Sequence, residues 1–164
     1  MLALRTALCI CISAVVILCS GCGDQGSDAA IASVNETNVQ RLANLYFAYQ
    51  MKHDWKGPAD EAEFKSFITA FNPQKLARIG VDPQATDELF VSQRDGQPFQ
   101  FRFGVRGSAI GCSEPVVFES AGVDGKFMVG FLNMEQREVD QDEYSALLAG
   151  GESSSARQRN SRER

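Results

Sequence analysis

The sequence VVFESAGVDGKFMVGFL, residues 116–132, predicts a β-hairpin. Its two runs rich in apolar residues, 116–120 and 127–132, have the length and composition of buried strands. Between them lies a turn in which Asp124 and Gly125 supply the positive φ angles that a tight hairpin requires. We therefore expect the two runs to pair within a small antiparallel sheet.

A further strand is expected upstream of this hairpin. Phe99, Phe101 and Phe103 alternate with polar residues, which is the two-residue period of a strand with one buried face.

The first half of the chain has the period of helices instead. Asn35 is the expected cap of a helix with an apolar face over residues 39–49, which ends near His53, before Gly57 and Pro58.

Two later helix starts are indicated by capping-box patterns at residues 60–63 and 140–143, each of which begins with an aspartate. A short helical turn over residues 74–79 is expected to stop at Gly80. The order of elements predicts an α+β domain. An N-terminal helix, broken near Gly57 and Pro58, packs on a small three- to four-stranded antiparallel sheet, and a short C-terminal helix follows.

The N-terminus has the pattern of a secretory signal. The apolar run of residues 7–19 follows the positive charge of Arg5 and is shorter than the about 20 residues that cross a bilayer. The segment LCSGC, residues 18–22, resembles a bacterial lipobox, with Cys19 at the position that is usually a large aliphatic residue. The resemblance implies cleavage before Cys22 and a diacylglyceride on its thiol, an anchor that holds stably with two or more acyl chains.

These features divide the chain into four parts. Residues 1–21 are the expected signal peptide, 22–33 a lipidated flexible tether, 34–149 the folded domain and 150–164 a disordered basic tail. The expected location is the cell envelope, with the domain on the periplasmic or outer side of a membrane. Gly23 after the anchor cysteine leaves the choice of inner or outer membrane open.

Composition restricts the chemistry of the domain. Residues 35–150 contain 11 Lys and Arg against 17 Asp and Glu, a net charge of −6 that disfavours nucleic-acid binding. Beyond Cys22 the only cysteine is Cys112, and His53 is the only histidine. An intramolecular disulfide in the mature chain and a zinc site of cysteine ligands are therefore excluded.

Two residues are candidates for catalysis, and each has a simpler interpretation. His53 could act as a general base or metal ligand, but a histidine at a helix C-terminus also meets the last carbonyls and the negative end of the dipole. Cys112 could be a reactive thiol, although a lone cysteine is more often a small packed hydrophobe. No nucleophile motif accompanies either residue, so we expect no catalytic residue and no cofactor.

One pattern resembles a known family. The segments LFVSQRDGQPF, residues 89–99, and FESAGVDGKF, residues 118–127, are similar to the paired motifs of major pseudopilins of type II secretion (G type). The resemblance extends over about residues 38–132 and implies a long N-terminal helix packed on a small antiparallel sheet. Its residues are turn formers, with Asp95, Gly96 and Pro98 in one bend and Gly122, Asp124 and Gly125 in the hairpin.

The chain departs from that family at its start, where a lipoprotein-like signal replaces the prepilin segment. It is also similar to a family of short bacterial lipoproteins, and this similarity implies no particular activity. Pseudopilins of this type hold calcium near the second motif, and Ser120 and Asp124 are the matching candidates. Apolar residues 127–132 replace the second acidic cluster, whereas calcium takes about six to eight oxygen ligands, so no metal site is expected.

The sequence thus favours a non-enzymatic envelope lipoprotein, a protein-interaction or assembly module held to the membrane by its lipid. Its expected partners are envelope or secretion proteins. One alternative is a small-ligand or calcium-binding envelope protein. Another is a hydrolase or thiol enzyme that uses His53 or Cys112.

Overall fold

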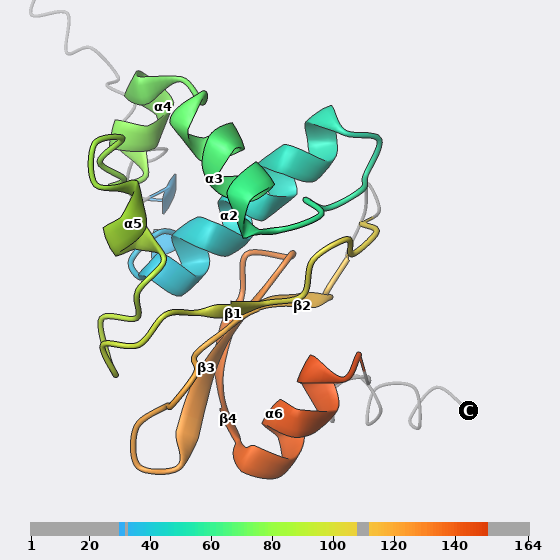
Figure 1. Cartoon of the computed structure of the whole chain (residues 1–164). Helices are drawn as coiled ribbons and strands as arrows, with labels where there is room; N and C mark the ends of the chain where they lie inside the picture. Colours follow the sequence, from blue (N-terminus) through green and yellow to red (C-terminus); the bar gives the residue numbers. More distant parts are fainter. Residues whose placement is uncertain (1–29, 32, 108–111, 151–164) are drawn as a thin grey trace, which may run out of the picture.

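The fold is built on a four-stranded antiparallel sheet in the order β1-β2-β3-β4. The computed structural model describes residues 30–31, 33–107 and 112–150 (Figure 1). The expected signal peptide, Cys22 and the basic tail lie outside these residues. The strands are β1 (Gln100–Phe101), β2 (Pro115–Phe118), β3 (Lys126–Phe131) and β4 (Gln136–Asp140).

Helices cover both faces of this sheet. Helix α2 (Asn38–Lys52) crosses one face and α6 (Gln141–Leu148) lies on the other (Figure 1). The period-2 geometry of β3 divides its side chains accordingly: Met128 packs toward the α2 core, while Phe127 and Val129 pack toward α6. Central strands buried on both faces are apolar runs rather than alternating ones, which is the pattern that residues 116–120 and 127–132 display.

Close packing of α2 on the sheet depends on Gly130. A Cβ atom at this position of β3 would lie 2.7 Å from Val39 Cγ1 and 3.0 Å from the Val39 carbonyl oxygen. Any larger residue would therefore push the helix off the strand.

Three short helices complete the layer beside α2. They are α3 (Glu61–Thr69), α4 (Pro73–Arg78) and α5 (Thr86–Leu89). The fully buried Phe64 of α3 joins them to the sheet, since its ring contacts Tyr46 at 5.7 Å and Phe101 at 5.9 Å between centroids. The aromatic residues between helix and sheet are thus part of the hydrophobic core.

The predicted fold class is confirmed. Asp60 and Asp140 cap α3 and α6 as expected, each accepting a hydrogen bond from the backbone N–H three residues on. Helix α2 ends at Lys52 with His53 as its C-cap, ahead of the break at Gly57 and Pro58.

Several details of the prediction are wrong. The cap of α2 is Thr37, which forms a reciprocal capping box with Gln40, whereas Asn35 donates from its amide to the Ile31 carbonyl. Ala30, Ile31 and Ser33 are helical, so the expected tether is folded at its end. The strand predicted at residues 99–103 is reduced to two residues, and the edge strand β4 and the single-turn α5 are additional.

Candidate functional site

The two turn-rich segments, residues 89–99 and 118–127, contact each other. Asp95 Oδ2 accepts hydrogen bonds from the N–H groups of Ala121 at 3.1 Å and Gly122 at 2.8 Å. The Ser120 hydroxyl donates to the Pro98 carbonyl, which closes the contact from the other side. We call these residues, 95–98 and 120–122, the motif clamp. It joins the loop before β1 to the β2–β3 hairpin.

The hairpin turn within the second segment has the predicted geometry. Val123 and Lys126 exchange backbone hydrogen bonds of 2.8 and 2.9 Å around the two turn residues. Asp124 and Gly125 have φ angles of 51° and 73°, as a type I′ turn requires.

Gly122, also at positive φ, has a second constraint. A Cβ atom there would lie 2.4 Å from the Lys126 carbonyl oxygen. The glycines of the motif are therefore required by backbone geometry.

The calcium candidates are positioned by the same hairpin. The Ser120 hydroxyl donates a hydrogen bond to the Pro98 carbonyl, and Asp124 is exposed at the tip of the turn. Across the described ranges, no group of three or more His, Cys, Asp or Glu residues is arranged to hold a metal ion.

A buried carboxylate that sequence reasoning missed lies next to the motif clamp. Glu119, directly after β2, is only 1% exposed. Its Oε1 accepts from the Ser92 hydroxyl at 2.8 Å, and its Oε2 accepts from the Met128 N–H at 2.7 Å. The Arg94 guanidinium lies 3.5 Å from Oε2 and balances the charge. The only signal in the sequence is an acid inside a run of apolar strand residues.

The Asp95 carboxyl is expected to make the stability of the domain depend on pH in the acidic range. Partial burial raises its pKa, but hydrogen bonds from the N–H groups of Gln97, Gly122 and Ala121 together hold the pKa below its ordinary value of 3.8. A depressed folded pKa stabilises the protein above the unfolded pKa, and this contribution is lost as pH falls through the folded value. The free energy of unfolding, measured with denaturant, should therefore be higher for the native chain than for Asp95→Asn at neutral pH. This difference should decrease below about pH 4. A gap that is constant with pH would contradict this role.

His53 lies at a corner where α2 ends, in a cleft of about 380 Å³. Its imidazole stacks on the Tyr49 ring with centroids 4.0 Å apart and an interplanar angle of 8°. The Tyr49 hydroxyl donates to Glu63 Oε1 at 2.5 Å, and the Ala59 N–H donates to Glu63 Oε2 at 2.7 Å. The carboxylate thus bridges the end of α2 and the start of α3.

The protonation states at this corner favour a structural role. Burial, with the Glu63 hydrogen bond and charge, raises the pKa of Tyr49 to about 12. The Tyr49 hydrogen bond lowers the pKa of Glu63 in turn. The phenol therefore keeps its proton at neutral pH, and the carboxylate is used to hold the phenol and the Ala59 N–H. His53 has an aromatic neighbour in place of a nucleophile.

Two consecutive residues directly after the C-cap of α2 have a strained backbone. Asp54 and Trp55 have φ angles of 50° and 61°, in the left-handed region that non-glycine residues rarely adopt. Each such conformation costs about 1–3 kcal/mol and persists only where its surroundings hold it. Here the Trp55 N–H donates to the Gln50 carbonyl at 2.8 Å, and the Gly107 N–H donates to the Trp55 carbonyl at 2.8 Å.

Cys112 is half-buried and packs against the main core. It does not belong to the described residues that line the His53 cleft. The structure thus gives the two catalytic candidates separate surroundings, a cleft for His53 and core packing for Cys112.

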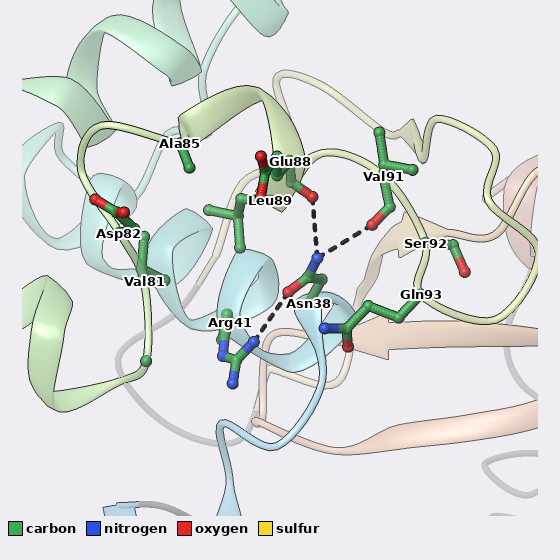
Figure 2. A pocket seen from close by; sticks show the side chains of 11 residues that line it. Asn38, Arg41, Val81, Asp82, Ala85, Glu88, Leu89, Val91, Ser92 and Gln93 are labelled. Atoms are coloured by element: carbon green, nitrogen blue, oxygen red, sulfur yellow. Dashed lines mark hydrogen bonds between the residues drawn. The ribbon is translucent and has the colours of Figure 1, made fainter.

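A second pocket, of about 490 Å³, lies between the first turns of α2 and the loop around α5 (Figure 2). Asn38 donates from its amide to the carbonyls of Glu88 and Val91, both at 3.1 Å. Arg41 donates from Nη1 to Asn38 Oδ1 at 3.0 Å and from Nε to the Ile79 carbonyl at 2.9 Å. Figure 2 shows the Asn38 and Arg41 side chains side by side at the pocket, bonded to protein atoms.

Comparisons of the chain with protein-family models, curated proteins and solved structures find no match. Among the described helices, none has the length and apolar character needed to cross a bilayer.

Proposed function

We propose that this chain is a non-enzymatic cell-envelope lipoprotein, held to its membrane through Cys22, whose α+β domain is a protein-interaction or assembly module. The observation that carries the proposal is that polar side chains at the motif clamp, the pocket and the His53 cleft form hydrogen bonds with the protein's own backbone. Asp95 holds the N–H groups of the hairpin, Asn38 holds the carbonyls near α5, and Glu63 holds the start of α3. Side chains used in this way build a rigid surface rather than a reactive centre.

The anchor part of the proposal rests on the N-terminal sequence. A short apolar run behind Arg5, followed by small residues before Cys22, is typical of lipoprotein signals. Cys112 packs against the core of the domain, whereas Cys22 stands at the end of the lipobox-like segment, which supports Cys22 as the proposed lipidation site.

The anchor is tested by expressing the full chain and its Cys22→Ser variant with radiolabelled palmitate in bacteria. The native chain should incorporate label and sediment with membranes, whereas Cys22→Ser should lose the label and accumulate as unprocessed precursor. Cys112→Ser is the matched control, since it removes a thiol from the folded domain, and it should keep label and processing. A labelled and processed Cys22→Ser protein would refute the anchor.

The interaction part is tested by crosslinking the lipidated protein in membranes, followed by purification. Recovery of the same envelope or secretion proteins with the native chain and with His53→Ala and Cys112→Ser is expected. If these variants remain folded but cannot restore the phenotype that deletion of the gene causes, an enzymatic function replaces the proposal.

A second candidate function is binding of a small polar ligand in the pocket beside Asn38 and Arg41. Its volume of about 490 Å³ lies within the range of about 300–1,000 Å³ typical of ligand sites. A saturable rise in melting temperature with a metabolite, absent in an Arg41→Ala variant, would favour this function.

A further inference from the structure

The C-terminal half of α2 carries an apolar stripe on its outer side. Phe47 and Met51 are four residues apart, and Trp55 follows at the same spacing just beyond the helix. Met51 is 62% exposed, the larger value of the two exposed large hydrophobic residues in the described chain. The half-buried rings of Phe47 and Trp55 lie 6.0 Å apart between centroids and form a continuous apolar surface beside it.

The backbone is strained where it presents Trp55. Two adjacent non-glycine residues at positive φ are held by the Gln50 carbonyl on one side and the Gly107 N–H on the other. Local folding does not require a tryptophan in this conformation, since a glycine would adopt it without strain. Conformations of this kind concentrate at binding and switch regions, so the outlier points to a use for the half-buried ring.

Two cationic side chains lie near the stripe, in a domain whose net charge is −6 over residues 35–150. Lys56 and Arg106 are both exposed and lie on paired backbone segments, joined as an antiparallel bridge. Within the described part of the chain neither side chain has an ion-pair partner. The Lys52 ammonium lies over the rings of Phe67 and Phe71, and Asp54 is the exposed acid between Met51 and Lys56. Two exposed cations beside half-buried aromatic rings and the exposed Met51 are complementary to anionic lipid headgroups.

We propose that this surface, defined by Phe47, Met51, Trp55, Lys56 and Arg106 and here called the tryptophan corner, docks on the anionic headgroups of the bilayer that carries the anchor. The inference rests on the proposed lipid anchor. Tryptophan suits such a surface because its ring is apolar and its N–H is polar, and the lysine and arginine stems can lie along the apolar region with their charges in the headgroups.

The length of chain before the domain permits this contact. The segment from Cys22 to Ala30 spans at most about 28 Å, and α2 is about 22 Å long. The far end of α2 can therefore reach the same membrane surface as the lipid. Contact through the tryptophan corner would lay α2 along the membrane and fix the orientation of the domain.

Trp55 itself reports on the contact, because it is the only tryptophan in the chain. The lipidated protein is reconstituted into vesicles of phosphatidylcholine with or without phosphatidylglycerol, with brominated phosphatidylcholine as quencher. In the anionic vesicles, the emission maximum of Trp55 should shift to the blue and its intensity should fall with brominated lipid. High salt should reverse both effects, since it screens the charge attraction.

A charge-reversal pair provides the matched comparison. Lys56→Glu with Arg106→Glu should abolish the quenching, and Met51→Ser should weaken it. The control reverses two exposed lysines elsewhere, Lys75→Glu with Lys126→Glu, and should quench like the native chain. Circular dichroism and melting temperature establish that each variant is folded.

The outcomes separate the inference from the proposed function. Protein that stays on anionic vesicles through its lipid with unquenched Trp55 overturns the tryptophan corner and leaves the anchor standing. Equal loss of quenching in both charge-reversal pairs also overturns it. Crosslinking that places Trp55 against another protein, with no quenching by brominated lipid, overturns it as well. If mass spectrometry shows Cys22 unmodified, the proposed anchor fails. The chain is then added to preformed vesicles, where unquenched Trp55 again overturns the inference.

Discussion

Replacing Glu119 by alanine is expected to lower the free energy of unfolding by about 2–4 kcal/mol. The substitution removes the acceptor of two buried donors, the Ser92 hydroxyl and the Met128 N–H, and leaves both without a partner. It also removes one of the two carboxylates that face Arg94. Urea denaturation of the two proteins measures the difference.

Glu138→Ala is the matched control for this prediction. Glu138 pairs with the same Arg94 at 2.8 Å, but its side chain is half-exposed, so its loss should cost less than about 1 kcal/mol. Equal costs for the two substitutions would show that burial of the Glu119 network contributes nothing to stability.

Substitution of Gly122 by alanine is expected to cost about 3 kcal/mol, compared with about 1–2 kcal/mol for Gly125→Ala. Both glycines have positive φ, so both variants include the strain of a left-handed alanine. Only at Gly122 would the new methyl group meet backbone, 2.4 Å from the Lys126 carbonyl oxygen, whereas the Cβ direction at Gly125 is open. The excess therefore measures the steric constraint in the motif clamp.

Thermal and urea unfolding of the two alanine variants give this comparison. Because the clamp also receives Asp95, Gly122→Ala should in addition remove much of the acid sensitivity that Asp95 contributes. A Gly125→Ala protein as unstable as Gly122→Ala would mean that the positive φ angle alone governs both positions.

The parts of the fold that were predictable depend on short-range chemistry. Asp124 and Gly125 form their turn because of their own φ preferences, and Asp60 and Asp140 cap the helices that they immediately precede. The same rule could have identified the start of α2, because Thr37 and Gln40 have the spacing of a capping box. Asn35 lacks such a partner, because the residue three positions after it is Asn38.

What could not be predicted depends on residues distant in the sequence. Glu119 is buried because Ser92 and Arg94 approach it from another segment of the chain, and no local pattern around position 119 specifies them. Strand β4 has one buried apolar residue, Val139, so its pairing with β3 leaves almost no periodic signal. The left-handed backbone of Asp54 and Trp55 is imposed by contacts with Gln50 and Gly107.

The same division applies to the candidate site. The turn motif was visible in the sequence as two groups of turn residues, but their mutual contact through Asp95 became apparent only in three dimensions. His53 was correctly expected at the end of a helix. Its stacking on Tyr49, and the Tyr49 bond to Glu63, follow from the packing of α3 against α2.

If the domain is held at a membrane as proposed, the order of its strands affects how neighbouring copies meet. Proteins tethered to a bilayer share a thin layer, in which collisions between neighbouring copies are frequent. An exposed sheet edge in that layer invites a neighbour to add its own strand. Here one edge is β1, only two residues long, and the other is β4, which carries Arg137 and Glu138 in its middle. Such edges oppose strand pairing between copies, so crowded domains are not expected to associate edge to edge through their sheets.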